Sequence, residues 1–96
     1  MGSLTPTTKR ARGTALDRIA PVLKVLGHPD RLRILRLLRA GDPTVAELAE
    51  RVGVAPNRAS QHISTLVSSG ILRRSRNGRS RQYEIVHPVA RILLDC

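Results

Sequence analysis

The sequence predicts a mainly α-helical domain with one small β-hairpin, which places it in the α+β class. Apolar residues recur at helical spacing over most of residues 15–69, with proline or a capping residue at helix starts and glycine near helix ends. Two arginine-rich runs then flank Asn77-Gly78, the dipeptide most typical of a tight hairpin turn. With 96 residues and no internal repeat, the chain is expected to form one domain over residues 14–96.

The N-terminal segment, residues 1–13, is expected to be a disordered basic arm. It combines Thr, Gly, Pro and three basic residues without any periodicity. Contact with a polyanion and a merely flexible terminus are about equally compatible with this composition.

Two helices are expected in the N-terminal half. The first starts at Thr14 or Ala15, and Pro21 either kinks it or marks its true start. The second is opened by residues 28–30, His-Pro-Asp, where the histidine is expected to cap the helix, and it stops at Gly41. Both helices are interpreted as scaffold.

Two further helices are expected on either side of Gly53. Thr44 and Glu47 form a capping box at the start of the first one. Gly53 supplies the left-handed residue that ends this helix and permits a tight turn. Pro56 suits the first turn of the next helix, which is expected to run to Ser69. This order of parts predicts a helix-turn-helix whose second helix reads DNA.

The polar face of residues 56–69 has the chemistry of a base-reading surface. It carries no Asp or Glu, which phosphates would repel, and its Arg, Gln and Asn side chains can form paired hydrogen bonds to base edges. Ala55 stands where Ser or Thr would cap the helix, which leaves backbone amides for a phosphate. His62, at the border of this face, is expected either to touch a phosphate or to pack beside the turn. An ordinary solvated helix face is the alternative interpretation. The predicted DNA-binding residues are Asn57, Arg58, Ser60, Gln61, His62, Ser64 and Thr65.

The arginine-rich runs, residues 71–76 and 79–85, are expected to pair as antiparallel strands around a two-residue turn at Asn77-Gly78. The expected cross-strand pairs are Arg76 with Arg79, Arg74 with Arg81, and Leu72 with Tyr83. Like charges directly opposite one another cost up to about 1 kcal/mol per pair. A phosphate backbone lying along the hairpin would offset that cost, whereas simple protection of an exposed edge is the alternative. The predicted DNA-binding residues of the hairpin are Arg74, Arg76, Asn77, Gly78, Arg79 and Arg81.

Several separated stretches resemble the ArsR/SmtB family of bacterial winged helix-turn-helix repressors. They are residues 26–35 (LGHPDRLRIL), 45–48, 60–63 with Leu66, 70–72, and Gly78 with Tyr83, and the resemblance covers residues 15–96. It implies a homodimer that binds an inverted-repeat operator and blocks transcription until an inducer arrives. It also implies that residues 56–69 form the recognition helix.

The resemblance implies that the first and last helices form the dimer interface. His87 and Pro88 introduce a short last helix, and both helices carry more aliphatic surface than one small domain can cover. The predicted interface residues are Leu16, Ile19, Leu23, Val89, Ile92 and Leu93.

The charge of the chain favours a nucleic-acid partner. Its formal net charge is +10 and its pI is about 11.7, which fits double-stranded DNA and also fits an acidic membrane surface. No apolar run approaches the length of a membrane span and no signal-peptide pattern is present, so a bacterial cytoplasmic protein, nucleoid-associated when bound to DNA, is expected. A sequence-indifferent architectural protein and an RNA-binding winged helix are the rivals, the latter disfavoured because stacking aromatic residues are missing.

No catalytic residue, cofactor or metal site is predicted. The chain shows no Ser-His-acid set, paired carboxylates or phosphate-binding glycine loop. Metal-sensing relatives carry cysteines in the helix before the turn, and the matching residues 44–50 have none. Near the C-terminus only His87 and Asp95 offer ligands, too far apart to share an ion along one helix, although a site across a dimer stays open. Cys96 is the single cysteine, so an intermolecular disulfide is the one redox switch available, and the sequence identifies no inducer.

Overall fold

The protein is described by a computed structural model over residues 14–77 and 80–96, with only the backbone described at residues 77, 80 and 81. These residues form five helices and one two-stranded antiparallel sheet. The elements are α2 (Ala15–Leu26), α3 (Pro29–Ala40), α4 (Val45–Val52), α5 (Pro56–Ser68), β1 (Leu72–Asn77), β2 (Ser80–Ile85) and α6 (Pro88–Asp95). The predicted fold class is confirmed, whereas the expected basic arm lies outside the described residues.

The helix-turn-helix is formed by α4 and α5, and its local chemistry is the expected one. At the start of α4, Glu47 N donates to Thr44 Oγ1 at 3.1 Å and Thr44 N donates to Glu47 Oε1 at 3.0 Å. The bond that the Glu47 carboxylate accepts from the Thr44 amide lowers the pKa of Glu47 most, and the Thr44 hydroxyl lowers it further. Gly53 ends α4 with φ 84°, and Val54 N donates to Ala49 O at 3.0 Å. This closure turns the chain directly into α5.

The core is aliphatic and centred on α3, which packs against α2, α4, α5 and β2. Its largest fully buried side chains come from four elements and the residue before β1: Ile34, Leu35, Leu48, Ile63, Leu66, Ile71 and Leu72. Because α5 contributes two of them, the orientation of its polar face is set by the burial of its apolar one.

Pro21 lies inside α2, which begins at Ala15, so the proline does not mark the true helix start. It removes one backbone donor from the helix. Val22 and Leu26, on the C-terminal side of the proline, are buried in the core. Tertiary packing therefore accommodates a residue that disfavours the helix interior.

The predicted register of the hairpin is wrong by two residues. The backbone pairs Leu72 with Ile85, Arg74 with Tyr83, and Arg76 with Arg81. The last described pair is Asn77 with Ser80, and residues 78 and 79 lie outside the described part. Leu72 is only 2% exposed and Ile85 packs against the core, so this register buries an apolar pair at the base of the hairpin. Full burial of a side chain such as Leu72 contributes about 1.5–3 kcal/mol, which favours this register.

A shift by two keeps every side chain on its predicted face but changes its neighbours. The expected pairing of Arg74 with Arg81 is wrong, and Arg76 lies opposite Arg81 in place of Arg79. Arg73 lies opposite Glu84 and forms an ion pair with it. Neither of the two predicted like-charge pairs is therefore formed, and the described backbone places one other such pair, Arg76 and Arg81, opposite each other.

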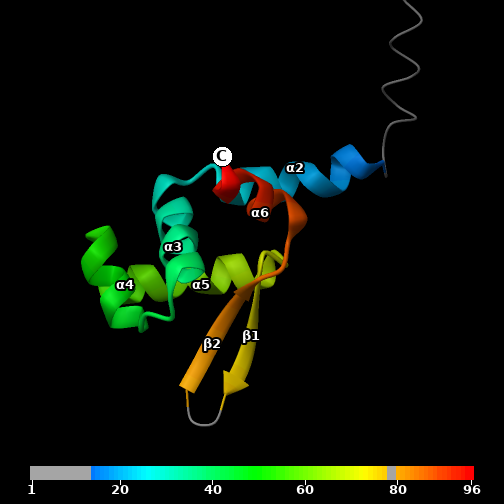
Figure 1. Ribbon diagram of the computed structural model, residues 1–96. Coiled ribbons are helices and arrows are strands. Elements are labelled where there is room, and N and C mark those ends of the chain that lie inside the picture. The colour runs from blue at the N-terminus through cyan, green and yellow to red at the C-terminus, as the bar shows by residue number, and fades with distance from the viewer. Residues whose placement is uncertain (1–13, 78–79) are drawn as a thin grey trace, which may run out of the picture.

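The elements are arranged with the hairpin at one end and two helices at the other. Figure 1 shows α2 and α6 together at the end of the molecule away from the hairpin, while α4 and α5 lie beside α3. Within residues 14–77 and 80–96, no helix has the length and hydropathy needed to cross a membrane.

Candidate nucleic-acid interface

The outer face of α5 presents the predicted polar side chains to solvent. Asn57, Arg58, Ser60, Gln61 and Ser64 are exposed. No acidic residue stands in the first turn, and Ala55 makes no side-chain cap. Such a helix end attracts anions, because the dipole and the free amides both favour negative charge.

The start of α5 offers fewer free amides than the sequence suggests. Pro56 has no N–H, and the amide of Arg58 donates to Ala55 O at 3.0 Å. Asn57 is thus the first-turn residue whose amide is best placed for a phosphate.

Arg31 joins this surface from α3. Together with residues of α5 it lines a shallow groove formed by Arg31, Arg58, Ser60, Gln61, His62, Ser64 and Thr65. Its guanidinium is held by two bonds, from Nε to His62 Nδ1 at 3.2 Å and from Nη1 to Val25 O at 3.3 Å. Sequence reasoning missed Arg31 because it lies 31 positions from His62, on a helix interpreted as scaffold.

His62 differs from the exposed residues of the reading face, and of its two expected roles its burial favours packing beside the turn. Its side chain is 4% exposed, and its ring meets the ring of His28 edge-on at a centroid distance of 4.6 Å. On α5 it lies one turn from the buried Ala59 and Leu66, so it turns inward with them. Burial lowers the pKa of His62 most, and the positive charges of His28 and Arg31 lower it further.

Thr65 lies at the edge of the reading face. It is half-buried, and its Oγ1 donates to Gln61 O one turn back at 3.0 Å. That bond occupies the hydroxyl proton and leaves Thr65 only an acceptor to offer.

The hairpin exposes part of its predicted arginine set. Arg74 and Arg76 are exposed and have no ion-pair partner among the described residues. The middle of the hairpin is anchored by Gln82, whose Nε2 donates to Oδ2 of Asp42, on the segment between α3 and α4, at 3.2 Å. Gly78 and Arg79, and the side chains of Asn77 and Arg81, fall outside the described residues.

An aliphatic face lies on α2 and α6. Leu16 is 75% exposed and Ile92 is 64% exposed. The exposed large apolar residues are Leu16, Leu23, Val86, Ile92 and Leu93, which include four of the six predicted interface residues. The other two, Ile19 and Val89, are half-buried, and Val89 packs against the domain's own core.

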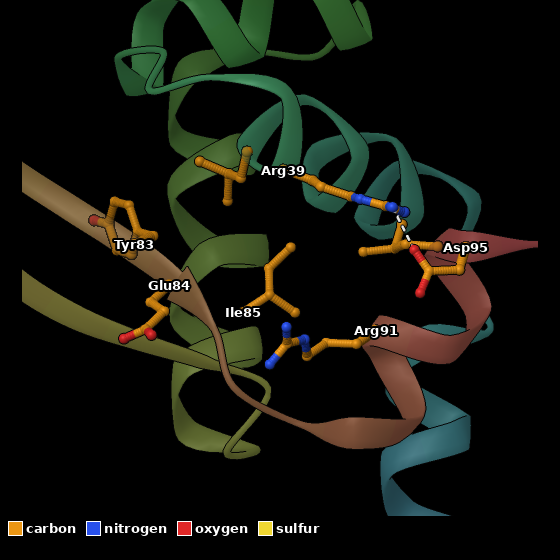
Figure 2. Close-up of a pocket in the computed structure, with 8 residues that line it drawn as sticks. Arg39, Tyr83, Glu84, Ile85, Arg91 and Asp95 are labelled. Carbon is orange, nitrogen blue, oxygen red and sulfur yellow. Dashed lines mark ion pairs between the residues drawn. The ribbon is translucent and has the colours of Figure 1, made fainter.

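A cavity of about 360 Å³ lies between α3, β2 and α6. Figure 2 shows the ion pair of Arg39 and Asp95 on one side of it and Arg91 extending beneath Ile85. Asp95, one of the two C-terminal metal-ligand candidates, is therefore engaged with Arg39 of α3. The cavity connects the base of the hairpin to the last helix.

A different group of ligand-bearing side chains is brought together by the fold. In the described part of the chain, the one cluster of three potential metal ligands consists of His28, Asp30 and His62. Sequence reasoning searched for ligands on one helix, whereas this cluster joins the start of α3 to the middle of α5.

Comparison with known proteins matches the same elements. A family model described as "Helix-turn-helix domain" matches residues 26–75, from the end of α2 to β1. The chain is 33% identical over 72 residues to the probable mercury resistance operon repressor of Streptomyces lividans, covering 75% of this chain and 58% of the relative. It is 33% identical over 81 residues to the transcriptional repressor SmtB of Mycobacterium tuberculosis, covering 83% of this chain and 60% of that protein.

A solved structure from Mycobacterium bovis is described as a homodimeric winged helix-turn-helix DNA-binding domain of a possible ArsR-family transcriptional regulator. It is 32% identical, with a TM-score of 0.68, and the match covers 83% of this chain and 74% of that one. The chain belongs to the ArsR/SmtB family. Members of this family that resemble it are DNA-binding transcriptional repressors and not enzymes. The chain spans about three fifths of the length of the S. lividans and M. tuberculosis relatives.

Proposed function

We propose that this ArsR/SmtB-family protein is a transcriptional repressor that binds an inverted-repeat operator as a homodimer on the DNA of the bacterial nucleoid. The observation that carries the proposal is the outer face of α5, where Arg58, Gln61 and Ser64 are exposed without a nearby acid in the first turn. Gln can form two hydrogen bonds to the major-groove edge of adenine, and Arg can form two to that of guanine.

The aliphatic face of α2 and α6 supports dimer formation. A patch containing side chains as exposed as Leu16 and Ile92 is typical of a surface that another protein covers. A second copy is the proposed occupant, because the related M. bovis domain is homodimeric. Two recognition helices related by a two-fold axis would then reach successive major grooves, about 10 bp apart.

The proposed repressor lacks the cysteine metal site of its metal-sensing relatives. The helix before the turn, residues 44–50, has no thiol, so arsenite or cadmium has no soft ligand pair there. Cys96 is exposed at the end of α6 and forms no disulfide within the chain. Replacing Cys96 by Ser is expected to leave repression intact.

The test separates base reading from charge attraction. Gln61→Ala is expected to weaken operator binding by about 1–3 kcal/mol and to leave random-sequence binding nearly unchanged, because no charge is removed. The double variant Arg74→Ala with Arg76→Ala is expected to weaken binding to both DNAs alike. It should also reduce the dependence of the affinity on salt concentration. Fluorescence anisotropy on the two duplexes at two salt concentrations measures both effects. Equal losses on both duplexes for Gln61→Ala would favour an architectural protein.

A further inference from the structure

The start of α3 and the middle of α5 meet through three side chains that all carry metal-binding atoms. His28 precedes α3, Asp30 lies in its first turn, and His62 faces them from α5. One potential ligand atom from each of the three lies within 4.8 Å of the other two. Segments far apart in the sequence thus converge on one point.

In both histidines one ring nitrogen accepts a hydrogen bond, which leaves the other free for a ligand. His28 Nδ1 accepts a hydrogen bond from Asp30 N at 3.2 Å, so Nε2 is the nitrogen left for a ligand. His62 Nδ1 accepts from Arg31 Nε at 3.2 Å, and that guanidinium always carries its hydrogen. Nε2 of His62 is therefore the nitrogen that remains.

That nitrogen is buried and unpartnered. His62 is 4% exposed, and its Nε2 has no hydrogen-bond partner among the described residues. Since Nδ1 accepts a bond, the neutral ring carries its proton on Nε2, as a buried donor with no acceptor. Such orphaned groups are rare in folded proteins, and a bound ion is one way in which they are satisfied.

We propose that His28, Asp30 and His62 bind a divalent transition metal ion of the zinc class. Two imidazoles and one carboxylate form a ligand set that zinc accepts, with a fourth position left for water. Calcium and magnesium prefer all-oxygen sites, so the two imidazoles select against them. Ligand atoms around tetrahedral zinc lie about 3.3 Å apart, so small rotations of the three side chains close the gap.

Metal binding requires a rearrangement at Arg31. When the ion takes the lone pair of His62 Nε2, the proton moves from Nε2 to Nδ1 through solvent, and the ring remains neutral. Nδ1 then becomes a donor, so the hydrogen bond from Arg31 Nε must break and the guanidinium must turn away. The ion therefore competes with Arg31 for His62.

The surrounding charge limits the affinity. Arg31 and Arg58 place positive charge near His62, and Asp30 also accepts a hydrogen bond from Arg33 at 2.9 Å. A divalent cation gains from one carboxylate and is repelled by the neighbouring guanidinium groups. Binding in the micromolar range is expected.

The experiment is a titration of the untagged full chain with Co²⁺ and Zn²⁺ in the Cys96→Ser background, which removes the one thiol. Residues 1–13 contain no His, Cys, Asp or Glu, so the N-terminal segment offers no competing side-chain ligand. Co²⁺ reports tetrahedral coordination through its visible absorption. One ion per chain is expected, with Zn²⁺ displacing Co²⁺ and raising the melting temperature.

Two matched substitutions locate the site. His28→Asn keeps a side chain able to cap α3 but removes the imidazole, and it is expected to weaken Co²⁺ and Zn²⁺ binding more than tenfold. His87→Asn makes the same exchange at the start of α6 and is expected to leave binding unchanged. His62→Gln is expected to abolish binding, with circular dichroism to show that the variant folds.

Two results would overturn the proposal. The first is the absence of saturable Co²⁺ or Zn²⁺ binding in the micromolar range, which would mean that only water occupies the position beside His62 Nε2. The second is equal binding by His28→Asn and the His87→Asn control, which would place the ion elsewhere. No DNA is present in these measurements, so their outcome is independent of the proposed repressor function.

Discussion

The helices α3 and α6 begin with the same His-Pro pair but differ in the residues that follow it. At α3 and at α6 a histidine is followed by proline, and its Nδ1 accepts a hydrogen bond from the backbone N–H two positions on, at 3.2 Å in each case. The next residues differ. Asp30 and Arg31 follow at α3, whereas Val89 and Ala90 follow at α6.

The tertiary surroundings of the two starts differ accordingly. Ala90 is fully buried and Val89 packs against the core, so the start of α6 is held by apolar contacts. Arg31 instead bonds His62 of α5, whose ring meets His28. The comparison teaches that the same local cap serves a structural contact in one place and a potential ligand site in the other, depending on what the rest of the chain brings to it.

The largest expected effect concerns the carboxylate that only the α3 start possesses. Asp30→Asn is expected to lower Zn²⁺ affinity by about 100-fold, because the cluster loses its only negative ligand. Asp95→Asn, which changes the acid at the end of α6, serves as control and should bind Zn²⁺ as the parent does. Calorimetric titration in the Cys96→Ser background measures both, and equal affinities for the two variants would contradict the asymmetry.

The next effect concerns the cation that competes with the metal. Arg31→Ala is expected to raise Zn²⁺ affinity about tenfold, since it removes both a repelling charge and the donor that occupies His62 Nδ1. Arg91→Ala removes a guanidinium from α6 and should have no such effect. If Arg31→Ala weakens Zn²⁺ binding instead, Arg31 supports the site, contrary to the proposed competition.

The shared cap should give equal effects at both starts. His28→Ala and His87→Ala are each expected to lower the free energy of unfolding by about 1 kcal/mol, because a helix N-terminal amide loses its acceptor. The Asn variants should recover most of this loss. Urea unfolding with a chelator present measures the free energy of unfolding of the four variants. If it falls at one helix alone, the two caps are not equivalent.

The smallest expected effect is a pH dependence of the free energy of unfolding, caused by His62 beside the start of α3. The pKa of His62 is lowered by burial and by nearby positive charge, so the unfolded chain binds more protons than the folded one below the ordinary histidine range. The free energy of unfolding should therefore fall as pH decreases from 7.5 through about 6.5, the unperturbed histidine pKa.

Three variants test whether His62 causes this pH dependence of the free energy of unfolding. His62→Gln is expected to remove this part of the slope, and His28→Asn to reduce it, because the His28 charge contributes to the shift. His87→Asn should keep the full slope. Unfolding curves across this pH range, with a chelator present, provide the measurement, and an unchanged slope in His62→Gln would assign the dependence to other groups.

Sequence reasoning located the functional elements well because their signals are local. The capping box of Thr44 and Glu47 and the left-handed Gly53 involve residues within one or two helical turns, and all are present. Gly70, with φ 75°, closes α5 by the same backbone chemistry, since Ile71 N donates to Leu66 O at 3.0 Å. The polar and apolar sides of α5 follow from helical periodicity alone.

The details that sequence reasoning missed depend on the rest of the fold. A turn preference at Asn77-Gly78 pointed to one register, but the burial of Leu72 against Ile85 selected another. His62 lay at the border of two faces on the helical wheel, and only the packing of α3 against α5 turned it inward.

By itself, the sequence determined the starts of α3, α4 and α5 and that α5 carries a polar outer face. Only the tertiary structure decided which residues share a site, joining Arg31 and His28 to His62 and separating Asp95 from His87 through its ion pair with Arg39. The reason is range: caps and turns are closed by bonds between residues a few positions apart, so they can be read from short stretches of sequence. A site built across two helices depends on which apolar faces bury each other, and that is a property of the whole core.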